Sequence, residues 1–257
     1  MSPIVSRAVS GPPRRASHPV RSAIRPSATP VPIEPRVAVV VFAASWMAAQ
    51  LLSAVALAIF GGGESVAETP IGVLAVSLLA AWSAYLGGMW YASQRAGTGD
   101  PVADYGITFA PIDAAGVAIG VLSQLVLVGI VYLPLEALWP DTFTDDRLQE
   151  NARDLVDRAD GGSIVLLVLI VVVGAPVVEE LFYRGLLQRP LVARFSDALV
   201  VIGVAALFAL VHFRPVEYPG LFAFGLVLGT CAVLTDRLGL PIVTHMSFNL
   251  TGLVLAW

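Results

Sequence analysis

Seven apolar runs separated by short polar stretches dominate this sequence. They cover residues 37–60, 70–91, 113–138, 163–187, 198–213, 218–234 and 240–257. A helix of about 20 apolar residues spans the hydrocarbon core of a bilayer, and these runs lack the alternation expected of a transmembrane strand. The pattern predicts an all-α, polytopic membrane helical bundle with about seven transmembrane helices. The shorter runs are candidates for re-entrant segments.

The composition supports a chain that lies in a lipid bilayer. Hydrophobic residues make up 57% of the 257 positions and charged residues only 13%, whereas an average soluble domain carries about 25% charged residues. This shortage of polar surface excludes a soluble globular protein, a disordered protein and a nucleic-acid-binding protein. The one cysteine, Cys231, excludes an intrachain disulfide and a cysteine-based metal site.

The chain divides into a basic tail and a membrane domain. Residues 1–36 are rich in Arg, Pro and Ser and carry a net charge of +5, against −9 for residues 37–257, and we expect this tail to be disordered. The loops are richest in arginine on the tail's side, which predicts a cytoplasmic N-terminus and an outside C-terminus in the cell membrane. The acidic stretch 140–161 predicts a polar helix on the outer surface, capped by Thr144.

A cluster of three charged residues interrupts the fourth apolar run. A charge in the bilayer core costs about 2.5–3.5 kcal/mol on insertion scales, so such residues are functional candidates. Glu180 and Arg184 stand four residues apart and are expected to pair along the helix. Glu179 points about 100° away from Glu180, and a desolvated carboxylate suits a general base. The alternative is a helix end that has already reached the lipid headgroups.

Two further polar clusters lie in the last two motif-bearing runs. His212 follows Phe208 by four residues, so the aromatic ring can fix the imidazole, and His245 stands four residues before Asn249 on one helix face. The alternatives are an interfacial histidine and an interhelical hydrogen-bonding pair. Together with Glu179, these groups supply the base, the oxyanion donors and the acid that peptide hydrolysis needs.

The three clusters, in order, resemble a known family. The runs Glu179-Glu180-x-x-x-Arg184, Phe208-x-x-x-His212 and His245-x-x-x-Asn249 are similar to those of the CPBP family of intramembrane proteases. This family, also called ABI, contains the type II CAAX prenyl endopeptidases and bacteriocin-processing proteases. The resemblance covers roughly residues 163–252 and leaves the first three spans without an assigned motif.

The resemblance implies an integral-membrane endopeptidase acting on a peptide or membrane-associated protein. By this similarity, Glu179 activates the attacking water with help from His212, His245 and Asn249 stabilise the oxyanion, and Glu180 and Arg184 support the site. The residues Glu179, His212 and His245 form a set that could hold Zn²⁺ with an open position. A metal-free glutamate mechanism is also proposed for the family, so no cofactor is assigned and zinc stays an alternative.

Three readings of the function remain open from the residues. The first is the endopeptidase, and the second is a catalytically silent membrane scaffold or bacteriocin-immunity protein of the same fold. The third is a small-solute or ion transporter that uses the buried carboxylates, against which the absence of an internal repeat counts. Because polar groups at this depth need water or protein partners, we expect a water-filled chamber that opens to the cytoplasmic side. The sequence does not specify the oligomeric state.

Overall fold

A computed structural model describes residues 32–61 and 68–257, and this part of the chain contains helices and turns without a strand. Residues 1–31 of the predicted tail 1–36 lie outside the described residues, and its last two residues belong to helix α2. The elements are α2 (Pro35–Phe60), α3 (Ile71–Ala96), α4 (Pro101–Tyr105), η2 (Pro111–Ala114), α5 (Ala115–Leu122), η3 (Ser123–Leu127), α6 (Val128–Leu138), α7 (Asp145–Asp157), α8 (Gly162–Val168), η4 (Leu169–Gly174), α9 (Ala175–Glu179), η5 (Glu180–Gln188), α10 (Arg189–Val192), α11 (Asp197–Leu210), η6 (Pro215–Glu217), α12 (Tyr218–Thr235) and α13 (Gly239–Ala256).

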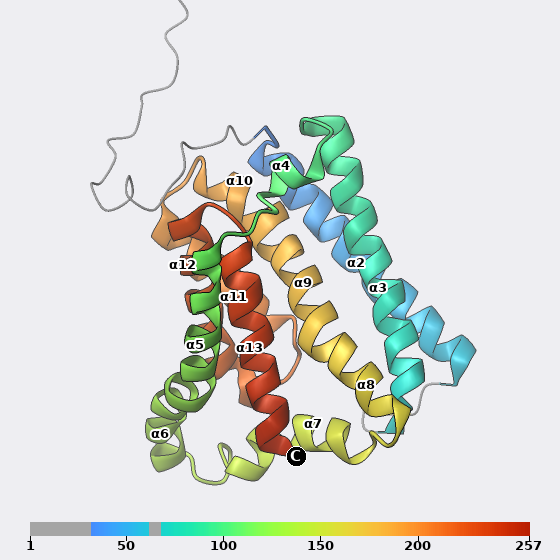
Figure 1. Ribbon diagram of the computed structural model, residues 1–257, viewed down its shortest axis with the longest axis vertical. Coiled ribbons are helices and arrows are strands. Elements are labelled where there is room, and N and C mark those ends of the chain that lie inside the picture. The colour runs from blue at the N-terminus through green and yellow to red at the C-terminus, as the bar shows by residue number, and fades with distance from the viewer. Residues whose placement is uncertain (1–31, 62–67) are drawn as a thin grey trace, which may run out of the picture.

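The helices form the membrane bundle that the apolar runs predict. Six of them, some built from several consecutive elements, are long and apolar enough to cross a membrane, namely Pro35–Phe60, Ile71–Ala96, Pro111–Leu138, Gly162–Val192, Pro215–Thr235 and Gly239–Ala256. The apolar helix α11 is shorter, with 14 residues. In Figure 1 the start of α2 and the C-terminus lie at opposite ends of the bundle, and α7 lies beside the C-terminus. The predicted all-α fold is confirmed, and the six candidate spans together with the shorter helix α11 account for the seven apolar runs.

The outer surface of the bundle is apolar, as a lipid-facing surface must be. Large side chains such as Val40, Leu133 and Leu199 are 67%, 72% and 71% exposed. Soluble proteins rarely expose apolar patches of more than a few hundred Å². An apolar surface of this extent is therefore typical of a protein surrounded by lipid. The helices and this surface make the chain a multi-pass membrane protein.

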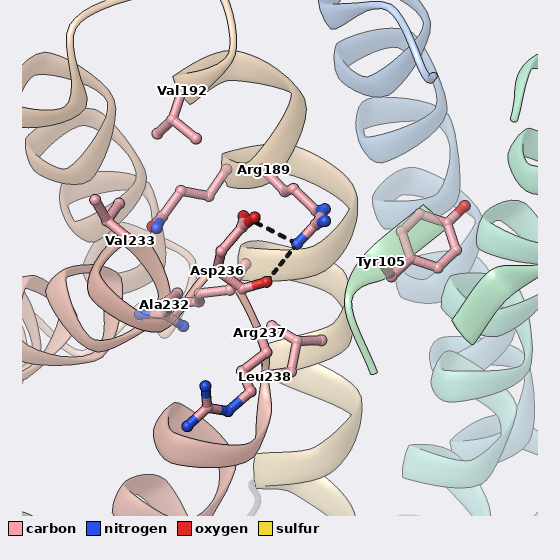
Figure 2. Close-up of a pocket in the computed structure, with 10 residues that line it drawn as sticks. Tyr105, Arg189, Val192, Ala232, Val233, Asp236, Arg237 and Leu238 are labelled. Atoms are coloured by element: carbon pink, nitrogen blue, oxygen red, sulfur yellow. Dashed lines mark hydrogen bonds and ion pairs between the residues drawn. The ribbon is translucent and has the colours of Figure 1, made fainter. Parts of the chain in front are cut away.

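The bundle end opposite α7 is held by two ion pairs around the loop before α13. Arg189 Nη1 lies 3.2 Å from Asp236 Oδ1, and Arg237 Nη2 lies 2.8 Å from Asp113 Oδ1. Figure 2 shows Arg189 directed at both the carboxylate and the backbone carbonyl of Asp236. The pocket between these residues has a volume of about 20 Å³, which is room for about one water. This region therefore fixes the start of α13 and offers no space for a larger ligand.

The acidic helix α7 has the start that the sequence predicts. Thr144 is its N-cap, and the Thr144 hydroxyl accepts a hydrogen bond from the backbone N–H of Arg147. An N-cap hydroxyl satisfies one of the free N–H groups of the first turn. The helix packs on α13 and on η6, so it covers one end of the bundle.

Helix α5 approaches α13 closely at two glycines. A Cβ atom at Gly116 would lie 2.8 Å from the backbone nitrogen of Thr244, and one at Gly120 would lie 2.3 Å from the carbonyl oxygen of Thr244. Small residues four apart let membrane helices pack backbone to backbone. This contact sets the position of the α13 segment that carries His245.

We expect Gly120→Ala to lower the thermal stability of the detergent-solubilised protein. The new methyl group must push α5 away from the Thr244 carbonyl, and such overpacking costs about 1–3 kcal/mol. Gly129→Ala is the matched control because nothing lies within 4 Å of a Cβ at that position of the same span. Equal melting temperatures for the two variants would contradict the close packing of α5 on α13.

Candidate active site

The two glutamates lie side by side in the sequence and face different surroundings in the fold. Glu179 is the last residue of α9 and Glu180 the first residue of the π-helical segment η5. The side chain of Glu180 is fully buried, whereas that of Glu179 is 24% exposed. The expected divergence of the two carboxylates is therefore present, with Glu180 inside the protein and Glu179 directed to a cavity wall.

The Glu180 carboxylate joins two of the three motifs. Its Oε1 atom accepts hydrogen bonds from Arg184 Nη1 and from His245 Nδ1, each at 2.9 Å. The Arg184 guanidinium is itself buried, lies over the ring of Phe208 with 4.7 Å to the centroid, and reaches the carbonyl of Gly225 on α12. The predicted pairing of Glu180 with Arg184 is confirmed, and it extends to α13 through His245.

His245 lies between the two glutamates. A carboxylate accepts hydrogen bonds, so the Nδ1 atom that faces Glu180 carries the proton, and Nε2 is left to face Glu179, 4.0 Å from its Oε2 atom. The rings of Phe208 and Phe224 flank the imidazole at 5.9 and 5.4 Å between centroids. This packing holds Nε2 at a separation from Glu179 that one bridging water can span.

His212 reaches the site because α11 is too short to cross the bilayer. Its 14 residues extend for about 21 Å, less than the core thickness of about 30 Å. The helix is followed by a turn in which Phe213 adopts a φ of 54°, a left-handed conformation that costs a residue with a side chain about 1–3 kcal/mol. The Phe208 ring packs edge-on against His212 at 4.9 Å, as the spacing predicts. The Phe208 carbonyl lies 2.6 Å from Nδ1 of His212. The other ring nitrogen, Nε2, does not take part in this contact.

Asn249 lies one helical turn beyond His245 and faces the same cavity. Its Nδ2 atom donates a hydrogen bond of 2.8 Å to the carbonyl of Val171, which belongs to the π-helical segment η4. An amide nitrogen carries two N–H groups, so one remains for a ligand. The expectation that His245 and Asn249 both point into the bundle is confirmed.

Two cavities adjoin these residues. The larger has a volume of about 330 Å³ and is lined by Glu179, His212, His245 and Asn249, by Gln124 of η3, and by the apolar stripe of α7 (Leu148, Ala152, Leu155). The smaller has a volume of about 220 Å³, shares Glu179 and His212 with the larger, and is otherwise walled by α2, α3, Tyr183 and Val211. The four residues thus meet at open space, which the catalytic interpretation requires.

The larger cavity lies next to the polar helix α7, which bears on the side to which the predicted chamber opens. The larger cavity adjoins α7 and the loop that carries Glu217, and the arginine distribution places α7 outside. If the larger cavity opens past α7, a cytoplasmic N-terminus and a chamber open to the cytoplasm exclude each other. The run length of 198–213 alone did not specify at which depth His212 lies, because that depth depends on how the short helix α11 packs in the bundle.

The three expected zinc ligands do not form a preformed metal site. Among residues 32–61 and 68–257, no three His, Cys, Asp or Glu side chains are grouped as a metal ion requires. The set Glu179, His212 and His245 therefore does not fit the closely spaced tetrahedral arrangement of a zinc ion. We assign no step of the chemistry to a metal.

The first three spans contribute residues for which the sequence showed no motif. Phe182 of η5 is stacked between Phe42 of α2 and Tyr85 of α3, at 4.3 and 4.0 Å between ring centroids. Tyr85 also lines the smaller cavity, and Gln124 lines the larger one. A lone amide in an otherwise apolar run is a signal that could have singled out Gln124, whereas aromatic residues in membrane spans are too common to indicate a site.

We expect Arg184→Met to destabilise the protein strongly. Removing one partner of a buried ion pair leaves an uncompensated charge and costs about 3–5 kcal/mol, to be measured by thermal unfolding in detergent. The double variant Glu180→Gln/Arg184→Met should recover part of this loss because no lone charge remains. Arg153→Met is the control, since its ion pair with Asp146 is exposed and exposed pairs contribute at most about 1 kcal/mol. A loss no larger in Arg184→Met than in Arg153→Met would contradict the role of the buried pair.

The segment that carries this site is similar to a known family. No curated protein and no solved structure matches the chain. Residues 161–251, about a third of the chain, match the family model described as type II CAAX prenyl endopeptidase Rce1-like. All six residues of the site fall inside the matched range. The recognition made from the three motifs is therefore confirmed: over residues 161–251 the chain is similar to the Rce1-like type II CAAX prenyl endopeptidases.

Proposed function

We propose that this protein is an integral-membrane endopeptidase that hydrolyses a peptide bond with a water activated by Glu179. The observation that carries the proposal is the position of His245, held by Glu180 on one side and facing Glu179 at 4.0 Å on the other. The family match supports a membrane protease of the CAAX type. The substrate is a peptide or a membrane-associated protein, and prenylation of that substrate is not required by any feature described above.

In the proposed reaction, the water lies between the Glu179 carboxylate and Nε2 of His245. Glu179 removes a proton from the water as its oxygen bonds to the carbonyl carbon of the scissile peptide. The oxyanion that forms accepts a hydrogen bond from the free N–H of Asn249. Nε2 of His245, the nitrogen without a proton in this tautomer, accepts a hydrogen bond from the attacking water and holds it at Glu179. The C–N bond then breaks, and Glu179 returns the proton to the leaving amine.

His212 is assigned to the position of the water and the substrate. Its Nδ1 proton is directed to the Phe208 carbonyl, so Nε2 can accept a hydrogen bond from a group in the cavity. Both cavities are lined by Glu179 and His212. This arrangement supports cleavage of an internal peptide bond of the substrate. A peptide with its scissile bond at Glu179 has open space for residues on both sides of that bond.

We expect Glu179→Gln to abolish cleavage while leaving the fold intact. General-base catalysis contributes about 10²–10⁴-fold, so the rate should fall by at least about 100-fold. Membranes from cells that express the wild type or Glu179→Gln are compared by proteomic detection of new peptide termini, with Glu136→Gln as a control on α6. Identical termini in the wild type and Glu179→Gln would favour the scaffold or immunity protein.

The proposed orientation has α7 outside and the arginine-rich loops in the cytoplasm. The chain's one cysteine, Cys231, is buried, so a single introduced cysteine reports its own position. We expect a membrane-impermeant maleimide to label Glu150→Cys on intact cells and Arg194→Cys only after permeabilisation; both positions are exposed. The reverse pattern would overturn the orientation and make the larger cavity a cytoplasmic one.

A further inference from the structure

We propose that Gln124 binds the backbone of the substrate peptide in the larger cavity. This inference rests on the proposed endopeptidase function and adds a substrate-binding residue from outside the segment that matches the family, residues 161–251. Gln124 lies in the third span and lines the cavity together with Glu179 and Asn249. Its side-chain amide has no hydrogen-bond partner within the described part of the chain.

The backbone around Gln124 has the same irregularity as the rest of the site. Gln124 belongs to the π-helical segment η3, Ser123–Leu127. The other π-helical segments, η4 and η5, carry the Val171 carbonyl bound by Asn249 and the Glu180 carboxylate bound by His245. Single π turns inside α-helices occur frequently at functional sites.

The packing of α13 places Gln124 next to the proposed oxyanion donor. A Cβ at Gly252 would lie 3.6 Å from the Gln124 amide, and Gly252 follows Asn249 by three residues, which puts both on one face of α13. The close contact of α5 with α13 at Gly120 holds this arrangement from the other side. The Gln124 amide therefore lies about one helical turn from Asn249, close enough to contact a peptide whose scissile carbonyl is at Asn249.

The chemistry of the amide indicates what it binds. A glutamine side chain offers N–H donors and a carbonyl acceptor, which are the groups that a peptide bond needs on either side. A half-buried amide without a partner has a less favourable free energy than a paired one, and an extended peptide backbone would satisfy it without requiring a particular side chain. Asn151 of α7, which also lines the cavity and likewise has no hydrogen-bond partner among the described residues, lies toward the α7 end of the same path.

The test is kinetic and uses synthetic decapeptides that span the Glu179-dependent cleavage sites found in membranes. We expect Gln124→Leu to raise KM about 3- to 10-fold with kcat within about 2-fold, the loss expected for one neutral hydrogen bond. Its melting temperature should not fall, because leucine suits an apolar span. Gln94→Leu is the matched control: Gln94 hydrogen-bonds Gly99 at the opposite end of the bundle, and its KM should be unchanged.

An N-methyl scan of the decapeptide separates binding from a structural effect. One backbone N–H of the peptide donates a hydrogen bond to the side-chain carbonyl of Gln124. Methylating that nitrogen should raise KM in the wild type and have no further effect on KM in Gln124→Leu. A general loss of structure would not produce this coupling. Two results would overturn this inference and leave the proposed function in place. The first is Glu179-dependent cleavage with the same KM in the wild type and in Gln124→Leu. The second is an N-methyl effect on KM that is as large in Gln124→Leu as in the wild type. The absence of any Glu179-dependent cleavage would overturn both.

Discussion

The buried carboxylate of Glu180 is the interaction on which the site depends. It accepts hydrogen bonds from Arg184 on its own helix and from His245 on α13, each at 2.9 Å. A lone charge inside a membrane protein is costly, and the cost falls only when a partner charge and hydrogen bonds compensate it. The same contact that neutralises Glu180 therefore fixes the tautomer of His245 and aims its second nitrogen at Glu179.

Irregular helices bring the remaining groups to this contact. The short helix α11 ends inside the layer, so His212 arrives at the level of Glu179 although it lies at the end of its apolar run. The π-helical segments η3 and η4 place Gln124 and the Val171 carbonyl at the same cavity. Regular helices of full span would have carried these polar groups to different depths, where each would have needed its own water or partner.

Much of the site could be predicted from sequence because polar residues are so rare in the spans. Glu179, Glu180, Arg184, His212, His245 and Asn249 each stand out in an apolar run, and i,i+4 spacing correctly paired Glu180 with Arg184 and Phe208 with His212. The level of His212 and the side on which the cavity opens were not predictable in this way. Both depend on where α11 ends and on how α7 covers the bundle, and these are set by contacts between distant segments.

The sequence by itself determined that the chain is a helical membrane protein and which residues are the candidates for its chemistry. Hydrophobic run length and the cost of charge in lipid are local properties, and they can be read from consecutive residues. Only the tertiary structure decided that His245 bridges Glu180 and Glu179, that no three ligands among the described residues gather for a metal, and that Gln124 joins the cavity. These facts depend on the close packing of α5 on α13 and of α13 on η4, which no local pattern specifies.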